Sequence, residues 1–228
     1  MNKEILVSVT TADDVDWRGA INEVSKFGIN RFALFLTGLN SEQREECYQT
    51  LSTLPNITIP FIHARTDMTL DEYELLSAHF GTELFNIHPL SDYPLIHDYT
   101  KIASHILVEN AGHLTKEDIK QFGGICLDIS HLENYRLSGS PRYEAVCQLL
   151  EDYPVKANHV SAITSKPYRD YDDAMKYANH TLTNLSQVDY LKNYPDRYFA
   201  PYIAIELTNN IESQLKIKEY MQKTLNLG

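Results

Sequence analysis

The most constraining feature of this sequence is a series of short apolar segments that each end in a residue able to bind a metal. The five clearest segments, 60–63, 84–88, 106–109, 125–128 and 202–206, end in His63, His88, Glu109, Asp128 and Glu206. A sixth segment, 157–159, is less apolar and ends in His159. In a parallel barrel the carboxyl ends of all strands open onto one face, where catalytic groups gather. The series therefore predicts both a parallel α/β barrel and a metal site at its mouth.

The alternation of strand-like and helix-like stretches supports the same fold. The strand patterns lie near 4–9, 31–37, 57–63, 84–88, 105–109, 124–128, 157–163 and 202–207. The helix patterns lie near 13–27, 41–54, 69–80, 93–103, 115–122, 141–152, 172–177 and 210–225. Eight strand–helix units close a (β/α)8 TIM barrel. The alternative is an open doubly wound sheet, but no glycine-rich phosphate loop follows the first strand. We therefore expect one α/β barrel domain over residues 1–228.

The composition indicates which binding partners and which cellular compartment to expect. The chain has 228 residues, 43% of them hydrophobic, which is enough for one barrel core. Its formal charge of −11 disfavours nucleic acid as a partner. The 3 cysteines have no paired spacing, which argues against a disulfide framework and favours a reduced, cytoplasmic setting. No apolar run reaches ~18 residues and no leader pattern opens the chain, so no membrane association is expected.

The polar residues at the strand ends are the candidate ligands. A carboxylate in a barrel core is costly unless it is paired, hydrogen-bonded or bound to a metal. Three carboxylates, Glu109, Asp128 and Glu206, each follow an apolar triplet. Five histidines also follow strand ends: His63, His88, His131, His159 and His180. Asp128 and His131 add a D-x-x-H spacing on one turn, which is weak alone and stronger with the other residues. Carboxylate and imidazole suit Zn²⁺ or Mn²⁺ best, with Mg²⁺ and Co²⁺ as further candidates.

These segments resemble the xylose-isomerase-like TIM barrel superfamily, which includes sugar isomerases, sugar epimerases and the endonuclease IV group. The matching segments are 61–64, 86–89, 108–112, 127–131, 158–160 and 205–206. The resemblance implies that Glu109, Asp128, His159 and Glu206 hold one divalent ion. In the isomerases and epimerases the two glutamates are also placed to move a proton beside the sugar carbonyl.

In the endonuclease group the resemblance implies further ions. The positions of His63 and His88 bind a second ion that shares Glu109, and those of His131 and His180 bind a third with an aspartate. Ala178 stands where that aspartate is expected. The usual glycine after the His-Pro pair and the usual aspartate after the seventh-strand histidine are also replaced, by Leu90 and Ala162. The phosphate and sugar contacts of the family therefore do not carry over directly.

Three functions remain open on this sequence. The leading one is a divalent-metal-dependent isomerase or epimerase of a small sugar or related hydroxycarbonyl, with Glu109, Glu206 and His131 as catalytic residues. The first alternative is an endonuclease IV-like phosphodiester hydrolase with two or more Zn²⁺ ions, and the second is a non-catalytic metal-binding barrel. For the leading function the partner is a small molecule, a sugar or sugar phosphate, and a homo-oligomer is a further candidate assembly. A few cations near the mouth, Arg65, Lys166, Arg169 and Lys176, are either an anion-binding rim or ordinary solubility charges.

Overall fold

A single sheet of parallel strands curls round on itself in the computed structural model, which describes residues 3–12, 15–169 and 175–226. The sheet has 9 strands in the order β1-β11-β8-β7-β6-β5-β4-β3-β2. Its strands are β1 Glu4–Leu6, β2 Ser8–Val9, β3 Ala33–Phe35, β4 Phe61–His63, β5 Leu84–Ile87, β6 Ile106–Glu109, β7 Ile125–Asp128, β8 Val155–Val160 and β11 Tyr202–Ile205. The two ends of the sheet, β1 and β2, are separated by Val7 alone, so together they form the first predicted strand. One half pairs with β11 and the other with β3, which closes the barrel.

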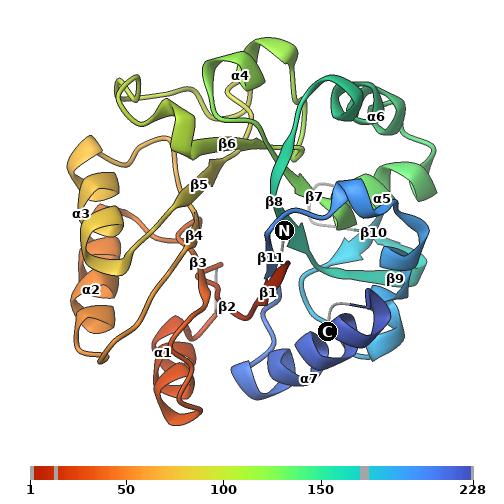
Figure 1. Ribbon diagram of the computed structural model, residues 1–228. Helices are drawn as coiled ribbons and strands as arrows, with labels where there is room; N and C mark the ends of the chain where they lie inside the picture. The colour runs from red at the N-terminus through yellow and green to blue at the C-terminus, as the bar shows by residue number, and fades with distance from the viewer. Residues whose placement is uncertain (1–2, 13–14, 170–174, 227–228) are drawn as a thin grey trace.

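Helices cover the outside of this ring of strands (Figure 1). They are α1 Trp17–Lys26, α2 Ser41–Ser52, α3 Leu70–Phe80, α4 Lys116–Gln121, α5 Ile129–Ser138, α6 Arg142–Asp152 and α7 Ile211–Thr224. Helices α3 and α4 begin after threonine caps: Thr69 and Thr115 each accept a hydrogen bond from the backbone N–H of the residue three positions on. None of the helices in the described ranges combines the length and hydropathy that a membrane crossing needs.

Side-chain alternation along the strands divides the core into an inner and an outer part. The barrel interior holds a small apolar cluster of Leu6, Ala33, Phe35, Phe61, Leu107, Cys126, Ala157 and Ala204. The intervening residues, such as Ile62 and Val108, face outward and pack with the helices in two larger clusters. Because side chains two positions apart lie on the same face of a strand, the residue two places after each interior residue also points inward. This register decides which polar residues enter the barrel.

The predicted helix at 93–103 is wrong. The segment is a loop that leads into a 3-10 helix, η1 Ala103–His105. Pro94 disfavours helical geometry at the preceding Tyr93, where the predicted helix begins. The loop is held instead by the buried Tyr99, whose hydroxyl donates to the backbone oxygens of Thr66 and Met68.

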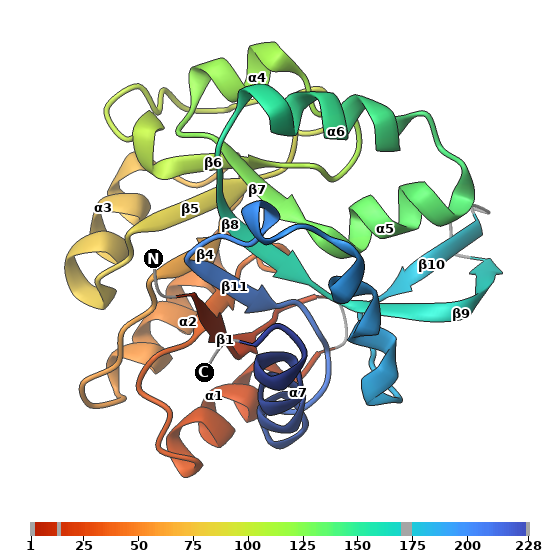
Figure 2. The same cartoon turned by 45° about the vertical axis from the view of Figure 1, so that its right-hand side comes forward.

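The region after β8 also differs from the prediction. Strand β8 ends at Val160, and β9 Ala162–Arg169 pairs with β10 Met175–Asn179 in an antiparallel hairpin. Of the helix predicted at 172–177, residues 172–174 lie outside the described residues, and 175–177 are strand. In Figure 2 the hairpin projects beyond the end of the barrel toward which β7, β8 and β11 run. Two 3-10 segments, η2 Leu185–Asn193 and η3 Asp196–Tyr198, then lead to β11.

Helix α5 was not predicted because buried polar residues conceal its periodicity. Ser130, Glu133 and Asn134 are as buried as their apolar neighbours. The helix begins directly after β7, and the Asp128 side chain caps it by accepting a hydrogen bond from the His131 backbone N–H at 2.9 Å. One candidate metal ligand therefore also sets the start of a helix.

Candidate metal centre

The carboxyl ends of four strands bring two glutamates, an aspartate and a histidine to one point. Glu109 ends β6, Asp128 ends β7, His159 lies in β8, and Glu206 directly follows β11. Each offers one ligand atom, and these atoms all lie within 4.8 Å of one another. Each residue stands two positions after an interior residue of its strand, so alternation alone turns its side chain into the barrel. We call these four residues the central group.

The central group contains buried polar atoms that are not satisfied by any of the described residues. Within residues 3–12, 15–169 and 175–226, Asp128 Oδ2, Glu206 Oε2 and both ring nitrogens of His159 have no hydrogen-bond partner. Buried polar atoms are normally paired, because leaving them unpaired costs free energy. His159 Nδ1 lies 3.3 Å from Glu109 Oε2 and 3.5 Å from Glu206 Oε2. Two ligands of one cation at ~2.0–2.2 Å are about 3.0–3.5 Å apart, so these residues fit a divalent ion.

A second group of potential ligands adjoins the first. His63 from β4, His88 after β5 and Glu109 also have ligand atoms within 4.8 Å of one another. His63 Nε2 lies 2.9 Å from Glu109 Oε2, yet in the part of the chain that the structure describes it has no partner with hydrogen-bond geometry. Burial, aided by the neighbouring His63, lowers the pKa of His88 to about 4. Its imidazole is thus neutral at pH 7, which is the form that binds a metal. Glu109 is common to both groups.

The two glutamates have different electrostatic surroundings. Burial would raise the pKa of Glu109, but His159 and His63 outweigh it and hold that pKa well below its usual range. Burial raises the pKa of Glu206 well above its usual range, and repulsion from Glu109 and Asp128 adds to the effect. The Glu206 side chain is also 14% exposed, against 1% for Glu109. Glu109 is therefore a fixed carboxylate, and Glu206 is the one that faces the opening.

Buried polar residues behind the centre hold its ligands, and sequence reasoning missed them. Asn86 Nδ2 donates to Glu109 Oε2 at 2.9 Å, and the Ser130 hydroxyl donates to Asp128 Oδ1. The Asn110 side chain accepts a hydrogen bond from the Asp128 backbone N–H at 2.6 Å and donates one to the Asp128 backbone oxygen at 2.9 Å. Asn86 lies two residues before His88, so the same alternation that selects the ligands would have selected it.

His131 and His180 lie at the rim rather than in either group. His131 Nε2 is 3.6 Å from Asp128 Oδ2 and 3.8 Å from Glu109 Oε1, with 28% of its side chain exposed. His180 Nδ1 is 3.9 Å from Glu206 Oε1 and its side chain is 47% exposed. These separations are longer than the 2.9, 3.3 and 3.5 Å between the histidine nitrogens and glutamate oxygens of the two groups.

Arg65 is the predicted rim cation that lies beside the centre. Together with His88 and Tyr93 it lines a small cavity of about 150 Å³. The Arg65 guanidinium donates to Asp67 at 2.9 and 3.2 Å and to the Thr37 backbone oxygen at 2.6 Å, which fixes its position. The other three cations, Lys166, Arg169 and Lys176, lie on the β9–β10 hairpin.

Comparison with known proteins identifies the fold. A xylose isomerase-like TIM barrel/4-hydroxyphenylpyruvate dioxygenase fusion protein matches with a TM-score of 0.54 at 12% identity, over 100% of this chain and 43% of that chain. The chain thus spans less than half of the fusion protein. A xylose isomerase domain-containing protein from Salmonella typhimurium matches at TM-score 0.41 and 17% identity, over 100% of this chain and 98% of that one. Endonuclease IV from Thermus thermophilus matches at TM-score 0.46 and 15% identity, over 98% of this chain and 99% of that one.

Sequence-based comparisons add nothing to this picture, since neither the scan of protein-family models nor the search of curated proteins found a match. The first structural match and the closed parallel sheet confirm the predicted fold, a (β/α)8 TIM barrel.

Proposed function

We propose that this protein is a divalent-metal-dependent isomerase or epimerase of a small sugar or sugar phosphate. The reaction would be a proton transfer at the carbon next to the substrate carbonyl. The observation that carries the proposal is the central group, where buried carboxylate and imidazole atoms converge without partners at the carboxyl ends of the strands. Active sites of TIM barrels lie at that face.

Glu109, Asp128, His159 and Glu206 would hold the ion. A divalent ion bound there acts as a Lewis acid that polarises the oxygens of a hydroxycarbonyl substrate. Asn86 and Ser130 keep the Glu109 and Asp128 carboxylates in place through their hydrogen bonds. Such outer partners preserve the geometry of a site that charged ligands alone would distort.

Glu206 is the better group for moving the proton. Burial and the contacts of Glu109 Oε2 tie that carboxylate to Asn86, His63 and His159. Glu206 Oε2 is buried and has no hydrogen-bond partner among the described residues, but the Glu206 side chain as a whole is 14% exposed, against 1% for Glu109. A general base must reach the proton that it abstracts, and only a side chain that faces the opening can do so. We therefore assign proton removal and return to Glu206, and a fixed ligand role to Glu109.

His131 and Arg65 would orient the substrate. The half-buried imidazole of His131 lies beside Asp128 and Glu109 on the open side, within reach of a substrate oxygen. The guanidinium of Arg65 lines the small cavity next to His88 and offers a positive charge to a phosphate or acidic group. Asp67 already pairs with Arg65 and compensates part of its charge. We therefore expect the contact between Arg65 and the substrate to favour an anionic substrate but not to be required for turnover.

One observation favours a second candidate function, metal-dependent phosphodiester hydrolysis. His63, His88 and Glu109 form a second ligand group that shares Glu109 with the first. Two adjacent ions can stabilise both the attacking and the leaving oxygen of a phosphoester. The formal charge of −11 opposes this function for nucleic acid, because a polyanion is repelled unless a basic surface overrides that charge.

The test measures metal content and both activities on the same preparation. The purified chain, loaded with Mn²⁺ or Zn²⁺, is incubated in D₂O with free and phosphorylated ketoses and aldoses, and exchange of the proton next to the carbonyl is followed by ¹H NMR. We expect exchange and interconversion that a chelator abolishes. The variant Glu206→Gln should lose both, whereas Glu212→Gln, an exposed acid on α7, should retain them.

The other outcomes identify the alternatives. Cleavage of abasic-site DNA without sugar turnover, together with two or more ions per chain, would replace the proposal with hydrolysis. A tightly bound ion with neither activity would favour a non-catalytic metal-binding barrel.

A further inference from the structure

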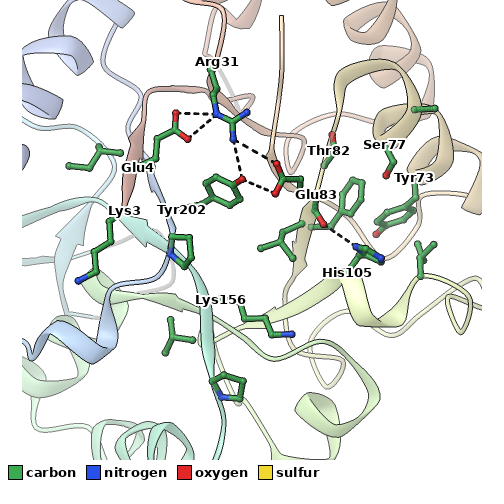
Figure 3. Close-up of a pocket in the computed structure, with 18 of the residues that line it drawn as sticks. Lys3, Glu4, Arg31, Tyr73, Ser77, Thr82, Glu83, His105, Lys156 and Tyr202 are labelled. Atoms are coloured by element: carbon green, nitrogen blue, oxygen red, sulfur yellow. Dashed lines mark hydrogen bonds and ion pairs between the residues drawn. The ribbon is translucent and has the colours of Figure 1, made fainter. Parts of the chain in front are cut away.

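A large cavity lies at the end of the barrel opposite the candidate metal centre. Its volume is about 1630 Å³, and it is lined by the first residues of several strands, including Ile5 in β1, Leu84 in β5, Val155 in β8 and Tyr202 in β11. The strands are parallel, so their amino ends are together at this face (Figure 3). Small-molecule pockets commonly have volumes of about 300–1,000 Å³, so this cavity is large enough for a ligand with an extended body.

One wall of the cavity is a network whose charges are already paired. Arg31 donates to Glu4 at 2.9 and 3.1 Å and to the Tyr202 hydroxyl at 3.0 Å. The Tyr202 hydroxyl in turn donates to Glu83 at 2.8 Å. These side chains join β1, the segment before β3, β11 and the segment before β5, as Figure 3 shows. The network fixes this wall and compensates the charge of Arg31.

Two lysines that line the cavity have no salt bridge within the described part of the chain. Figure 3 shows the Lys156 side chain across the cavity from the Arg31 network. Lys156 of β8 and Lys218 of α7 both line the cavity, both are partly buried, and neither forms an ion pair within the described part of the chain. Burial lowers the pKa of Lys218, and the negative charge of Glu4 only partly opposes this effect. A partly buried ammonium without a salt bridge is unfavourable, and a ligand anion would reduce that penalty.

The charge balance of the lining is opposite to that of the whole protein. The cavity is lined by the basic residues Lys3, Arg31, Lys101, Lys156 and Lys218 and by the acidic residues Glu4, Glu74 and Glu83. Lys3 pairs with Asp196, which does not line the cavity, and the other basic residues of the lining still outnumber the acidic ones in a chain of formal charge −11. The lining also includes apolar residues, among them Ile5, Leu84 and Val155. An apolar surface with a local positive charge is complementary to an amphipathic anion.

We propose that this cavity is a second binding site, for a small organic acid with a long apolar or aromatic body. The acid group would lie at Lys156 and Lys218, and the body would pack on Ile5, Leu84 and Val155. The site is at the other end of the barrel from Glu109 and Glu206, so it does not depend on the proposed metal chemistry.

The experiment uses dodecanoate as the probe in isothermal titration calorimetry of the full chain. Acetate has the same charge without the apolar body, and dodecyltrimethylammonium has the same body with the opposite charge. We expect one dodecanoate per chain and no binding of the other two. Chelator and the variant Glu206→Gln should leave the affinity unchanged, which separates this site from carboxylate binding at a metal.

Substitutions at the lysines locate the site. Each of Lys156→Ala and Lys218→Ala should weaken dodecanoate binding about tenfold, and the double variant about a hundredfold. Lys223→Ala, an exposed lysine on α7 that does not line the cavity, is the matched control and should bind as wild type. Circular dichroism checks that every variant is folded.

Several results would overturn the proposal. Unsaturable uptake of many probe molecules per chain would show ordinary detergent behaviour. Equal affinity for dodecyltrimethylammonium, or unchanged affinity in the double lysine variant, would show that the lysines do not recognise an acid group. Failure of dodecanoate to bind at all would leave the cavity as a surface for a protein segment rather than for a small acid.

Discussion

Replacing Glu206 with glutamine should abolish most of the stabilisation that a divalent ion provides, without destabilising the metal-free protein. Glutamine has nearly the same size as glutamate, so packing at the end of β11 is preserved. The three carboxylates of the central group have ligand atoms within 4.8 Å of one another. At that largest separation and an effective dielectric constant of 20, two full like charges repel by about 3.5 kcal/mol. Burial and this repulsion raise the pKa of Glu206, so a negative charge at this position does not stabilise the metal-free protein. Metal-free E206Q should therefore be at least as stable as metal-free wild type.

With the ion bound, wild type should be more stable than E206Q. A ligand at a hundred times its Kd stabilises the folded state by about 2.7 kcal/mol. For a chain of this size about 2–4 °C of Tm corresponds to each kcal/mol, so wild type should gain about 5–11 °C. Loss of one ligand that weakens binding about 100-fold leaves a gain of only about 0.4 kcal/mol, or about 1–2 °C, at the same ion concentration.

Thermal melts give the Tm of wild type and of E206Q, each measured once with chelator and once with Mn²⁺ or Zn²⁺. Glu212→Gln serves as the control, because Glu212 is an exposed acid paired only with Lys216 among the described residues. An equal ion-dependent gain in wild type and E206Q would refute the assignment of Glu206 as a ligand. A large loss of stability in metal-free E206Q would instead show that Glu206 has a structural role.

Three further outcomes follow from contacts away from the opening. Asn86→Leu removes the hydrogen bond to Glu109 and should lower metal affinity about 10–100-fold, measured by competition with a chelating dye. Arg44→Met should cost about 2–4 kcal/mol in urea unfolding, because the buried Arg44 makes a bidentate pair with Glu72. Burial raises the pKa of Glu72 but Arg44 outweighs it, so the folded-state pKa is lowered. The stability that this pair contributes is therefore present above the unfolded pKa of about 4.3, and the difference between wild type and Arg44→Met should shrink as pH falls below it.

The strand ends could be read from the sequence because two local rules coincide there. An apolar run that ends in a polar residue marks the point where a buried strand emerges, and the period of two decides which side chains face inward. Leu107 and Glu109 share the interior face of β6, and Ala157 and His159 share that of β8. The predicted positions of the barrel strands are confirmed within a few residues.

The predictions were wrong where tertiary contacts outweigh local pattern. Helix α5 buries Ser130, Glu133 and Asn134, so its sequence lacks an apolar stripe. The loop that replaces the helix at 93–103 is held by the Tyr99 hydroxyl, which bonds to backbone oxygens more than 30 residues away in sequence. Neither the burial of these polar residues nor the hydrogen bonds of Tyr99 can be predicted from the residues of the segment alone.

The sequence by itself determined the class of fold and the kinds of residue at the mouth of the barrel, because strand periodicity and residue chemistry are local properties. Only the tertiary structure decided which of those residues meet. Barrel closure and register place Glu206 beside His159 and leave His131 and His180 at the rim. The same closure brings Lys156 and Lys218, distant in sequence, to one cavity at the other end. Distances between segments depend on the packing of the whole barrel, and no single segment encodes them.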